Sequence, residues 1–114
     1  MIEKLRLFLT ILEEGSLRRA AGRCHIAQSA ITRQIQLLEQ DLGGQVLERI
    51  SAGVRPTNGG YALAEKARTL LADYDSAMAE VRRLVRGESD RLRIGYLASA
   101  MHEYLAPEIG RAHV

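Results

Sequence analysis

The sequence predicts a mainly α-helical fold that ends in one long helix. Apolar residues recur at helical spacing in three successive segments, glycines separate these segments, and an apolar seam of strict 4-3 spacing runs through residues 63–84. The chain has 114 residues, of which 46% are hydrophobic and 26% charged. This length and composition allow one modest core and exclude a disordered or collagen-like chain.

Gly15 and Ser16 separate the first two predicted helices. The first helix is predicted because Leu5, Phe8, Leu9 and Leu12 recur at helical spacing, and Gly15 ends it. Ser16 is a good N-cap for a short second helix with the sequence LRRAAGRC. The inward face of that second helix is predicted to be small or apolar, and consists of Leu17, Ala20, Ala21 and Cys24. Its alanines allow another helix to approach closely.

A break at residues 25–27 precedes a third helix, predicted over residues 28–41 and ended by two glycines. Its apolar face has spacings of 4, 3 and 4 and consists of Ile31, Ile35, Leu38 and Leu42. Its opposite face is polar and carries Gln28, Ser29, Thr32, Arg33 and Gln36. The third helix is therefore amphipathic, with one face for the core and one for solvent or a ligand.

Residues 46–56 follow a different pattern, typical of a two-stranded hairpin with a tip of small residues at 51–53. Thr57 can cap the fourth helix, although Gly59 and Gly60 weaken its first turn. A short helix, a three-residue break and a second helix, followed by such a hairpin, match a helix-turn-helix with a wing.

The fourth helix carries the apolar seam over three heptads. A helix that packs only on its own domain shows a broader stripe with a period of 3.6 residues, so the seam predicts a partner helix and a homodimer. The alternative is that these residues pack within one chain. The seam consists of Leu63, Ala67, Leu70, Tyr74, Ala77, Val81 and Leu84.

A helix-turn-helix places its second helix in the DNA major groove, where short polar side chains and arginine read the base edges. The predicted base contacts form one continuous face of the third helix: Gln28, Ser29, Thr32, Arg33 and Gln36. The predicted contacts to the DNA backbone or minor groove are Arg18, Arg19 and Arg55. Residues 15–38 contain four arginines and no acidic residue, as a phosphate-facing surface requires. A solvated helix face carries similar charge, so charge alone leaves both interpretations open.

Residues 8–63 closely resemble the N-terminal module of LysR-type transcriptional regulators. The resemblance rests on the motifs EEGS, QSAITRQI, LG and ER at these spacings, and extends over about residues 3–97. It implies a winged helix-turn-helix with a dimerising linker helix, in a bacterial regulator that binds double-stranded DNA sequence-specifically as a dimer, and as a tetramer at full length. It also implies that the third helix is the recognition helix and that Arg55 is the wing arginine.

The resemblance further implies a domain organisation. Residues 1–58 correspond to the winged helix-turn-helix, 59–87 to the linker helix, 88–91 to a hinge, and 92–114 to the start of a truncated α/β effector-binding domain. The segment LRIGYLAS looks like the first strand of that domain, and Ser99 matches a position that often contacts the effector. We expect effector sensing to be lost or incomplete, with a small-molecule effector only if the missing domain is present. One reading frame of a common sequencing adapter encodes residues 109–114, so we expect this end to be non-native.

The sequence departs from the family pattern at four places. Ala27 stands where a capping serine is usual, and Gln36 where arginine is frequent. Leu47 replaces a common phenylalanine, and residues 58–59 replace the usual Glu-Ala at the start of the linker helix. These changes remove a cap, a charge, part of a core side chain and some helix propensity, but they leave the polar face of the third helix in place.

Enzymes and pure adaptors fit the sequence less well. The candidate catalytic groups are Cys24 beside His25, His102 beside Glu103, and His113, yet no metal-ligand spacing, phosphate-binding loop or nucleophile elbow accompanies them. We therefore expect no enzymatic activity, metal or cofactor. A coiled-coil adaptor would use only the seam of the fourth helix and would not need the polar face of the third.

The sequence also carries information about location. No apolar run is long enough to span a bilayer, and no signal peptide precedes the first helix. A single cysteine excludes an internal disulfide and suits a reducing compartment. We expect a cytoplasmic, nucleoid-associated chain with no membrane partner.

Overall fold

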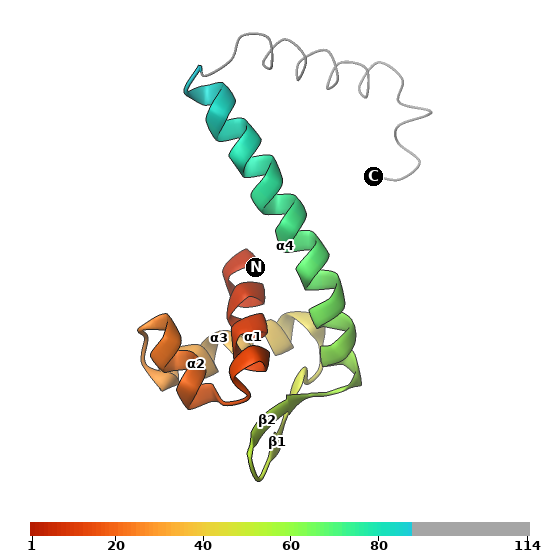
Figure 1. The fold of residues 1–114 in the computed structure, drawn as a ribbon. Helices are drawn as coiled ribbons and strands as arrows, with labels where there is room; N and C mark the ends of the chain where they lie inside the picture. The colour runs from red at the N-terminus through yellow and green to blue at the C-terminus, as the bar shows by residue number, and fades with distance from the viewer. Residues whose placement is uncertain (88–114) are drawn as a thin grey trace, which may run out of the picture. The chain divides into compact units, whose positions relative to one another are not determined.

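The computed structural model describes residues 1–87 of the chain. Its elements are α1 (Ile2–Glu14), α2 (Leu17–Cys24), α3 (Gln28–Leu42), β1 (Leu47–Ile50), β2 (Gly53–Pro56) and α4 (Asn58–Val85) (Figure 1). The predicted mainly α fold, with a winged helix-turn-helix followed by a long helix, is confirmed. The expected hinge at 88–91, the effector-domain start at 92–114 with Ser99, and the non-native end at 109–114 lie outside the described residues.

The chain divides into two units, Met1–Asp73 and Tyr74–Val114. One apolar core occupies the first unit, where α1, α2 and α3 pack on one another (Figure 1). Its largest fully buried side chains are Phe8, Ile11, Ile31 and Leu38. In α1, Leu5, Phe8 and Ile11 are buried, whereas Leu9 and Leu12 are half-buried against the core.

α2 is capped at both ends, by a side chain at its start and by backbone hydrogen bonds at its end. The hydroxyl of Ser16 accepts a hydrogen bond from the backbone N–H of Arg19 at 3.2 Å, which confirms the predicted N-cap. Ala20 and Ala21 are buried, as predicted, whereas Cys24 is half-buried and free. His25 ends α2 in the left-handed region, with φ of 58°. His25 is therefore a residue of the turn between α2 and α3.

α3 buries Ile31, Ile35 and Leu38, as predicted. The assignment of Leu42 to the same inward face is wrong, because its side chain is 50% exposed. Leu42 is the last residue of the helix, and Gly43, with φ of 79°, reverses the chain there. Ala27 precedes α3 and gives it no side-chain cap, as the sequence predicts.

β1 and β2 form an antiparallel hairpin that pairs Glu48 with Arg55 and Arg49 with Val54. The hairpin lies against the turn between α1 and α2, where the N–H of Val54 donates to the carbonyl oxygen of Gly15 at 3.1 Å. A Cβ atom on Gly53, whose φ is 142°, would lie 2.1 Å from that same oxygen. Only glycine permits this close approach, so Gly53 fixes the hairpin on the helical body.

α4 begins with the expected cap, because the hydroxyl of Thr57 accepts from the N–H of Gly60 at 3.0 Å. Gly60 has a second role, which the sequence does not indicate. A Cβ atom on Gly60 would lie 2.1 Å from the carbonyl oxygen of Val46, so α4 can pack on the start of the hairpin only with glycine at this position. The weak first turn of the helix is thus a requirement of close packing.

The residues that α4 buries differ from the predicted seam. They are Gly60, Ala64, Ala67 and Leu71. Ala67 has no exposed surface, so its assignment to a face for a second chain is corrected: it belongs to the core of its own unit. Leu63 is half-buried against that core, and Leu70 is 55% exposed.

In the second unit, the described residues from Tyr74 onward continue the helix to Val85. Tyr74 is 41% exposed, and Ala77 is exposed as well. Val81 and Leu84 are half-buried. No helix within residues 1–87 is both long enough and apolar enough to cross a bilayer.

Candidate nucleic-acid interface

The outer face of α3 carries the five predicted base-contacting residues together. The inward residues of α3 turn this face to solvent: Gln28, Ser29, Arg33 and Gln36 are exposed, and Thr32 is half-buried. Arg33 makes no ion pair with another side chain of residues 1–87, so its guanidinium is available to a ligand. A row of amide, hydroxyl and guanidinium groups on one helix face suits hydrogen bonding to base edges.

Arg18 and Arg19 lie side by side at the start of α2, but their side chains have different hydrogen-bond partners in the structure. The Arg19 guanidinium donates to the carbonyl oxygen of Glu14, from Nε at 3.1 Å and from Nη2 at 2.6 Å. It therefore caps the C-terminal end of α1, and its contact to a DNA phosphate stays a prediction. Arg18 is exposed and remains a predicted phosphate contact.

Arg23 joins α2 to the end of α1. Its Nη1 lies 2.6 Å from a carboxylate oxygen of Glu13 and 3.2 Å from one of Glu14. Hydrogen bonds to Glu13 and then to Glu14 raise the pKa of Arg23 above its ordinary value. Within residues 1–87, the charge of Arg23 is therefore compensated by two carboxylates, whereas Arg19 bonds only a neutral carbonyl oxygen and keeps its positive charge, as do Arg18 and Arg33.

The wing arginine is paired with an acid on the neighbouring strand. Nε of Arg55 lies 2.6 Å from Oε1 of Glu48, and these two residues face each other directly across the hairpin. Both side chains are exposed, at 61% and 41%, so the pair is solvated. A phosphate or a base edge that approaches Arg55 has to compete with Glu48.

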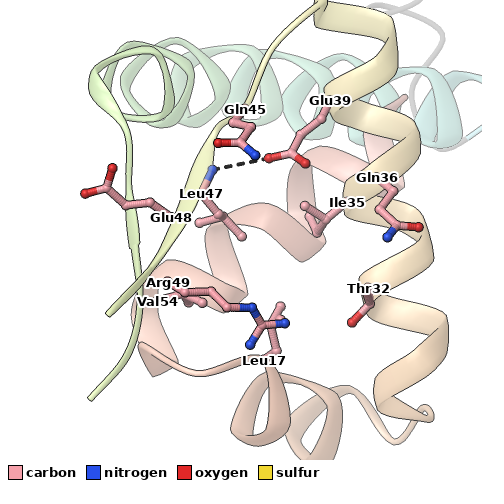
Figure 2. Close-up of a pocket in the computed structure, with 10 residues that line it drawn as sticks. All are labelled: Leu17, Thr32, Ile35, Gln36, Glu39, Gln45, Leu47, Glu48, Arg49 and Val54. Atoms are coloured by element: carbon pink, nitrogen blue, oxygen red, sulfur yellow. Dashed lines mark hydrogen bonds between the residues drawn. The ribbon is translucent and has the colours of Figure 1, made fainter. Parts of the chain in front are cut away.

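A carboxylate of α3 ties the hairpin to the helix, a contact that the sequence analysis missed. Oε2 of Glu39 accepts a hydrogen bond from the backbone N–H of Val46 at 2.9 Å. It accepts a second one from the N–H of Leu47 at 3.4 Å, which Figure 2 draws. Thr57 joins the two ends of the hairpin, since its hydroxyl donates to the carbonyl oxygen of Gln45 at 2.8 Å. These bonds fix the position of the hairpin relative to the polar face of α3.

A cleft of about 360 Å³ separates the hairpin from α3. Thr32, Gln36 and Glu39 line it from the helix, and Leu47 and Arg49 line it from β1. Figure 2 shows the guanidinium of Arg49 entering this cleft. The sequence analysis did not select Arg49, although the alternation of side chains along β1 places it on the same side as Leu47.

Two classes of site receive no support from the described part of the chain. Within residues 1–87, no group of three or more His, Cys, Asp and Glu side chains is arranged to hold a metal ion. Cys24 is half-buried, and the neighbouring His25 lies at the C-terminal cap of α2. The geometry defines a winged helix-turn-helix with an exposed polar face on α3.

The comparison with protein families agrees with this class. Residues 2–61 match the family described as "Bacterial regulatory helix-turn-helix protein, lysR family". The chain belongs to the LysR family, which is a family of transcriptional regulators and not of enzymes.

Individual relatives match this chain over about a third of their own length. The transcriptional regulator ClcR of Pseudomonas putida is 43% identical over 98 residues, which cover 86% of this chain and 33% of that protein. The small neutral protease regulatory protein of Streptomyces coelicolor is 39% identical over 98 residues, which cover 86% of this chain and 30% of that protein. The chain thus spans about a third of the length of these relatives.

Solved structures of related proteins have the same fold. The DNA-binding domain of BenM, in a complex with catB site 1 DNA, superposes with a TM-score of 0.72 at 37% identity, covering 79% of this chain and 97% of that one. Full-length CbnR in complex with its target DNA gives a TM-score of 0.69 at 38% identity, covering 76% of this chain and 30% of that one.

Proposed function

We propose that this chain binds double-stranded DNA sequence-specifically as the DNA-binding part of a bacterial transcriptional regulator. The observation that carries the proposal is the exposed polar face of α3, which has an unpaired Arg33 at its centre and a hairpin fixed beside it. The similarity to DNA-binding domains solved on DNA supports this function. The proposed location is the cytoplasm, where the nucleoid lies.

In the proposed complex, α3 lies in the major groove. Gln28 and Gln36 are suited to adenine, and Arg33 to guanine, because amide and guanidinium groups match the paired donors and acceptors of those bases. Ser29 and Thr32 add short hydroxyl groups to the same face. Arg18 lies on the neighbouring helix and contacts a phosphate, which positions the domain without reading sequence.

We further propose that α4 joins two copies of the chain. Leu70 is 55% exposed in the first unit, and Tyr74 is 41% exposed in the second, which is unusual for large apolar residues that repeat along one helix. Residues 58–85 would then act as the linker helix of a homodimer that reads two half-sites. A tetramer and a response to a small-molecule effector are proposed only for a protein that carries a complete effector domain.

The decisive experiment compares two arginine variants on selected and unselected DNA. A high-affinity site is first selected from random duplexes, and binding is then measured on that site and on a mixed-sequence duplex. Arg33→Ala should weaken binding to the selected site by about 1–3 kcal/mol and affect the mixed-sequence duplex much less. Arg18→Ala should weaken both equally and lower the salt dependence by about one contact.

The same measurements distinguish other outcomes. A chain that binds no duplex at any salt concentration would contradict the DNA-binding proposal and favour the coiled-coil adaptor. Equal losses on both duplexes for both variants would contradict the division between base reading and phosphate anchoring.

A further inference from the structure

We propose that Arg49, rather than the predicted wing arginine Arg55, is the principal contact of the wing to the DNA backbone. This inference rests on the proposed function. It gives a role in DNA binding to a residue that belongs to the ER motif but is not among the predicted DNA contacts. It follows from three features of the first unit: the direction of the Arg49 side chain, the course of the cleft beside α3, and the ion pair that holds Arg55.

The position of Arg49 on β1 directs its charge toward the recognition helix. Figure 2 shows its guanidinium reaching from the hairpin into the cleft, toward Leu17 and Thr32, whereas the Glu48 carboxylate points away from α3. Arg49 is exposed, and its side chain makes no hydrogen bond or ion pair with residues 1–87. It therefore presents a full positive charge to whatever enters the cleft.

The expected occupant of the cleft is the sugar-phosphate backbone. When α3 lies in the major groove and the hairpin reaches the adjacent minor groove, the strand of phosphates between the two grooves runs between helix and hairpin. Thr32, Gln36 and Arg49 supply hydrogen-bond donors along this course. Glu39 also lines the cleft, but the N–H groups of Val46 and Leu47 already bond its carboxylate.

Arg55 is a poorer phosphate ligand because its charge is already compensated. Its Nε lies 2.6 Å from Oε1 of Glu48, and the pair carries no net charge. Binding a phosphate through Arg55 would either break this pair or leave Glu48 close to the phosphate, and like charges repel. Arg49 has no ion pair with a carboxylate of residues 1–87. Its contact with a phosphate should therefore release a counterion from the DNA more completely than a contact of Arg55.

The test uses the 114-residue chain and a labelled mixed-sequence duplex of about 40 bp, with affinity measured between about 50 and 200 mM salt. Arg49→Gln should remove one phosphate contact per bound chain, lowering the salt slope by about 0.9 and the affinity about eight-fold at roughly 0.1 M salt. Arg49→Lys keeps the charge and should keep the slope. Arg55→Gln, the matched control on the same hairpin, should change the affinity less than about two-fold.

A second comparison isolates the part played by Glu48. Glu48→Gln frees Arg55, so adding Arg55→Gln in that background should lower the salt slope much more than Arg55→Gln does alone. Unchanged thermal unfolding of all variants, expected for exposed positions, shows that the differences arise at the interface.

The outcomes separate this inference from the function on which it rests. If the unmodified chain binds the duplex with a steep salt slope and Arg49→Gln binds equally well, the assignment of Arg49 is wrong and the proposed function stands. If Arg55→Gln alone lowers the slope, the wing contact belongs to Arg55. If the unmodified chain fails to bind, the proposed function fails, and the inference fails with it.

Discussion

α3 buries residues at spacings of 4 and 3, and α4 at spacings of 4, 3 and 4, yet the two helices bury different kinds of side chain. α3 covers its largest apolar residues, which are Ile31, Ile35 and Leu38. α4 buries three small residues, Gly60, Ala64 and Ala67, and one large residue, Leu71. Large residues of α4, such as Leu70, remain exposed. Periodicity therefore locates an apolar stripe, whereas residue size decides how closely the helix approaches the core and which stripe the domain covers.

The first prediction concerns the large residues of α3. Leu38→Ala should lower the free energy of unfolding by about 2–5 kcal/mol, because Leu38 is fully buried and its truncation leaves a cavity. Leu42→Ala is the matched control on the same helix and should change stability by less than about 0.5 kcal/mol, since Leu42 is half exposed. Urea unfolding followed by circular dichroism measures both. Similar losses at the two positions would contradict the burial assigned to α3.

The second prediction concerns the small residues of α4. Gly60→Ala should destabilise the domain by about 1–3 kcal/mol, because the added Cβ atom meets the carbonyl oxygen of Val46 and forces the helix away. At the neighbouring Gly59, an added Cβ meets only the hydroxyl of Thr57 at 3.8 Å, an ordinary contact. Gly59→Ala should therefore stabilise the chain by about 0.4–1 kcal/mol. A thermal scan in which both variants shift in the same direction would show that helix propensity, not close approach, governs this turn.

The sequence predicted the helices better than it predicted their packing. Helical spacing and caps such as Ser16 are local properties, and the structure bears them out at α1, α2 and α3. The role of Gly60 depends on the backbone of Val46, which is distant along the chain, and no local pattern reveals such a contact. The same limit explains why Ala67 was assigned to a partner helix, although its own domain already covers it.

The candidate site shows a similar division between local and non-local information. The polar face of α3 follows from one helix alone, so the sequence could locate all five of its residues. The sequence could not distinguish the arginines from one another, because their surroundings depend on partners in other elements. Arg19 bonds the end of α1, and Arg55 pairs with Glu48 of β1. Arg49 was missed because the cleft that it enters exists only after the hairpin is fixed to α3.

The third prediction compares how the two helices begin. α4 has a side-chain cap, the hydroxyl of Thr57, whereas α3 begins at Ala27 without one. Ala27 already has extended backbone angles, φ of −67° and ψ of 147°, which suit a capping residue. Ala27→Ser should therefore stabilise the domain by about 0.5–2 kcal/mol, and Thr57→Ala should cost a similar amount. Chemical denaturation checks both signs, and a neutral Ala27→Ser would mean that α3 needs no cap at this end.

The last prediction concerns the exposed stripe of α4, where the expected effect on the folding of one chain is smallest. Leu70 is 55% exposed, and glutamate is a good helix former, so Leu70→Glu should change the unfolding free energy of the isolated chain by only about 0.5 kcal/mol. In a dimer, the same substitution would place a carboxylate from each chain in an apolar seam, where unpaired charges are strongly unfavourable. Sedimentation analysis should therefore find monomers.

A control at Ala72 distinguishes an effect on the apolar seam from a general effect of an added negative charge. Ala72 is exposed and lies on another side of the helix from Leu70, since two residues correspond to a rotation of about 200°. Ala72→Glu should keep the self-association of the unmodified chain. The recognition face of α3 contains neither residue, so the Leu70→Glu monomer should still bind a half-site, and its affinity for a site of two half-sites about 34–36 Å apart should fall toward that value. An intact dimer of Leu70→Glu with full affinity would mean that the exposed stripe of α4 is not the surface that joins two chains.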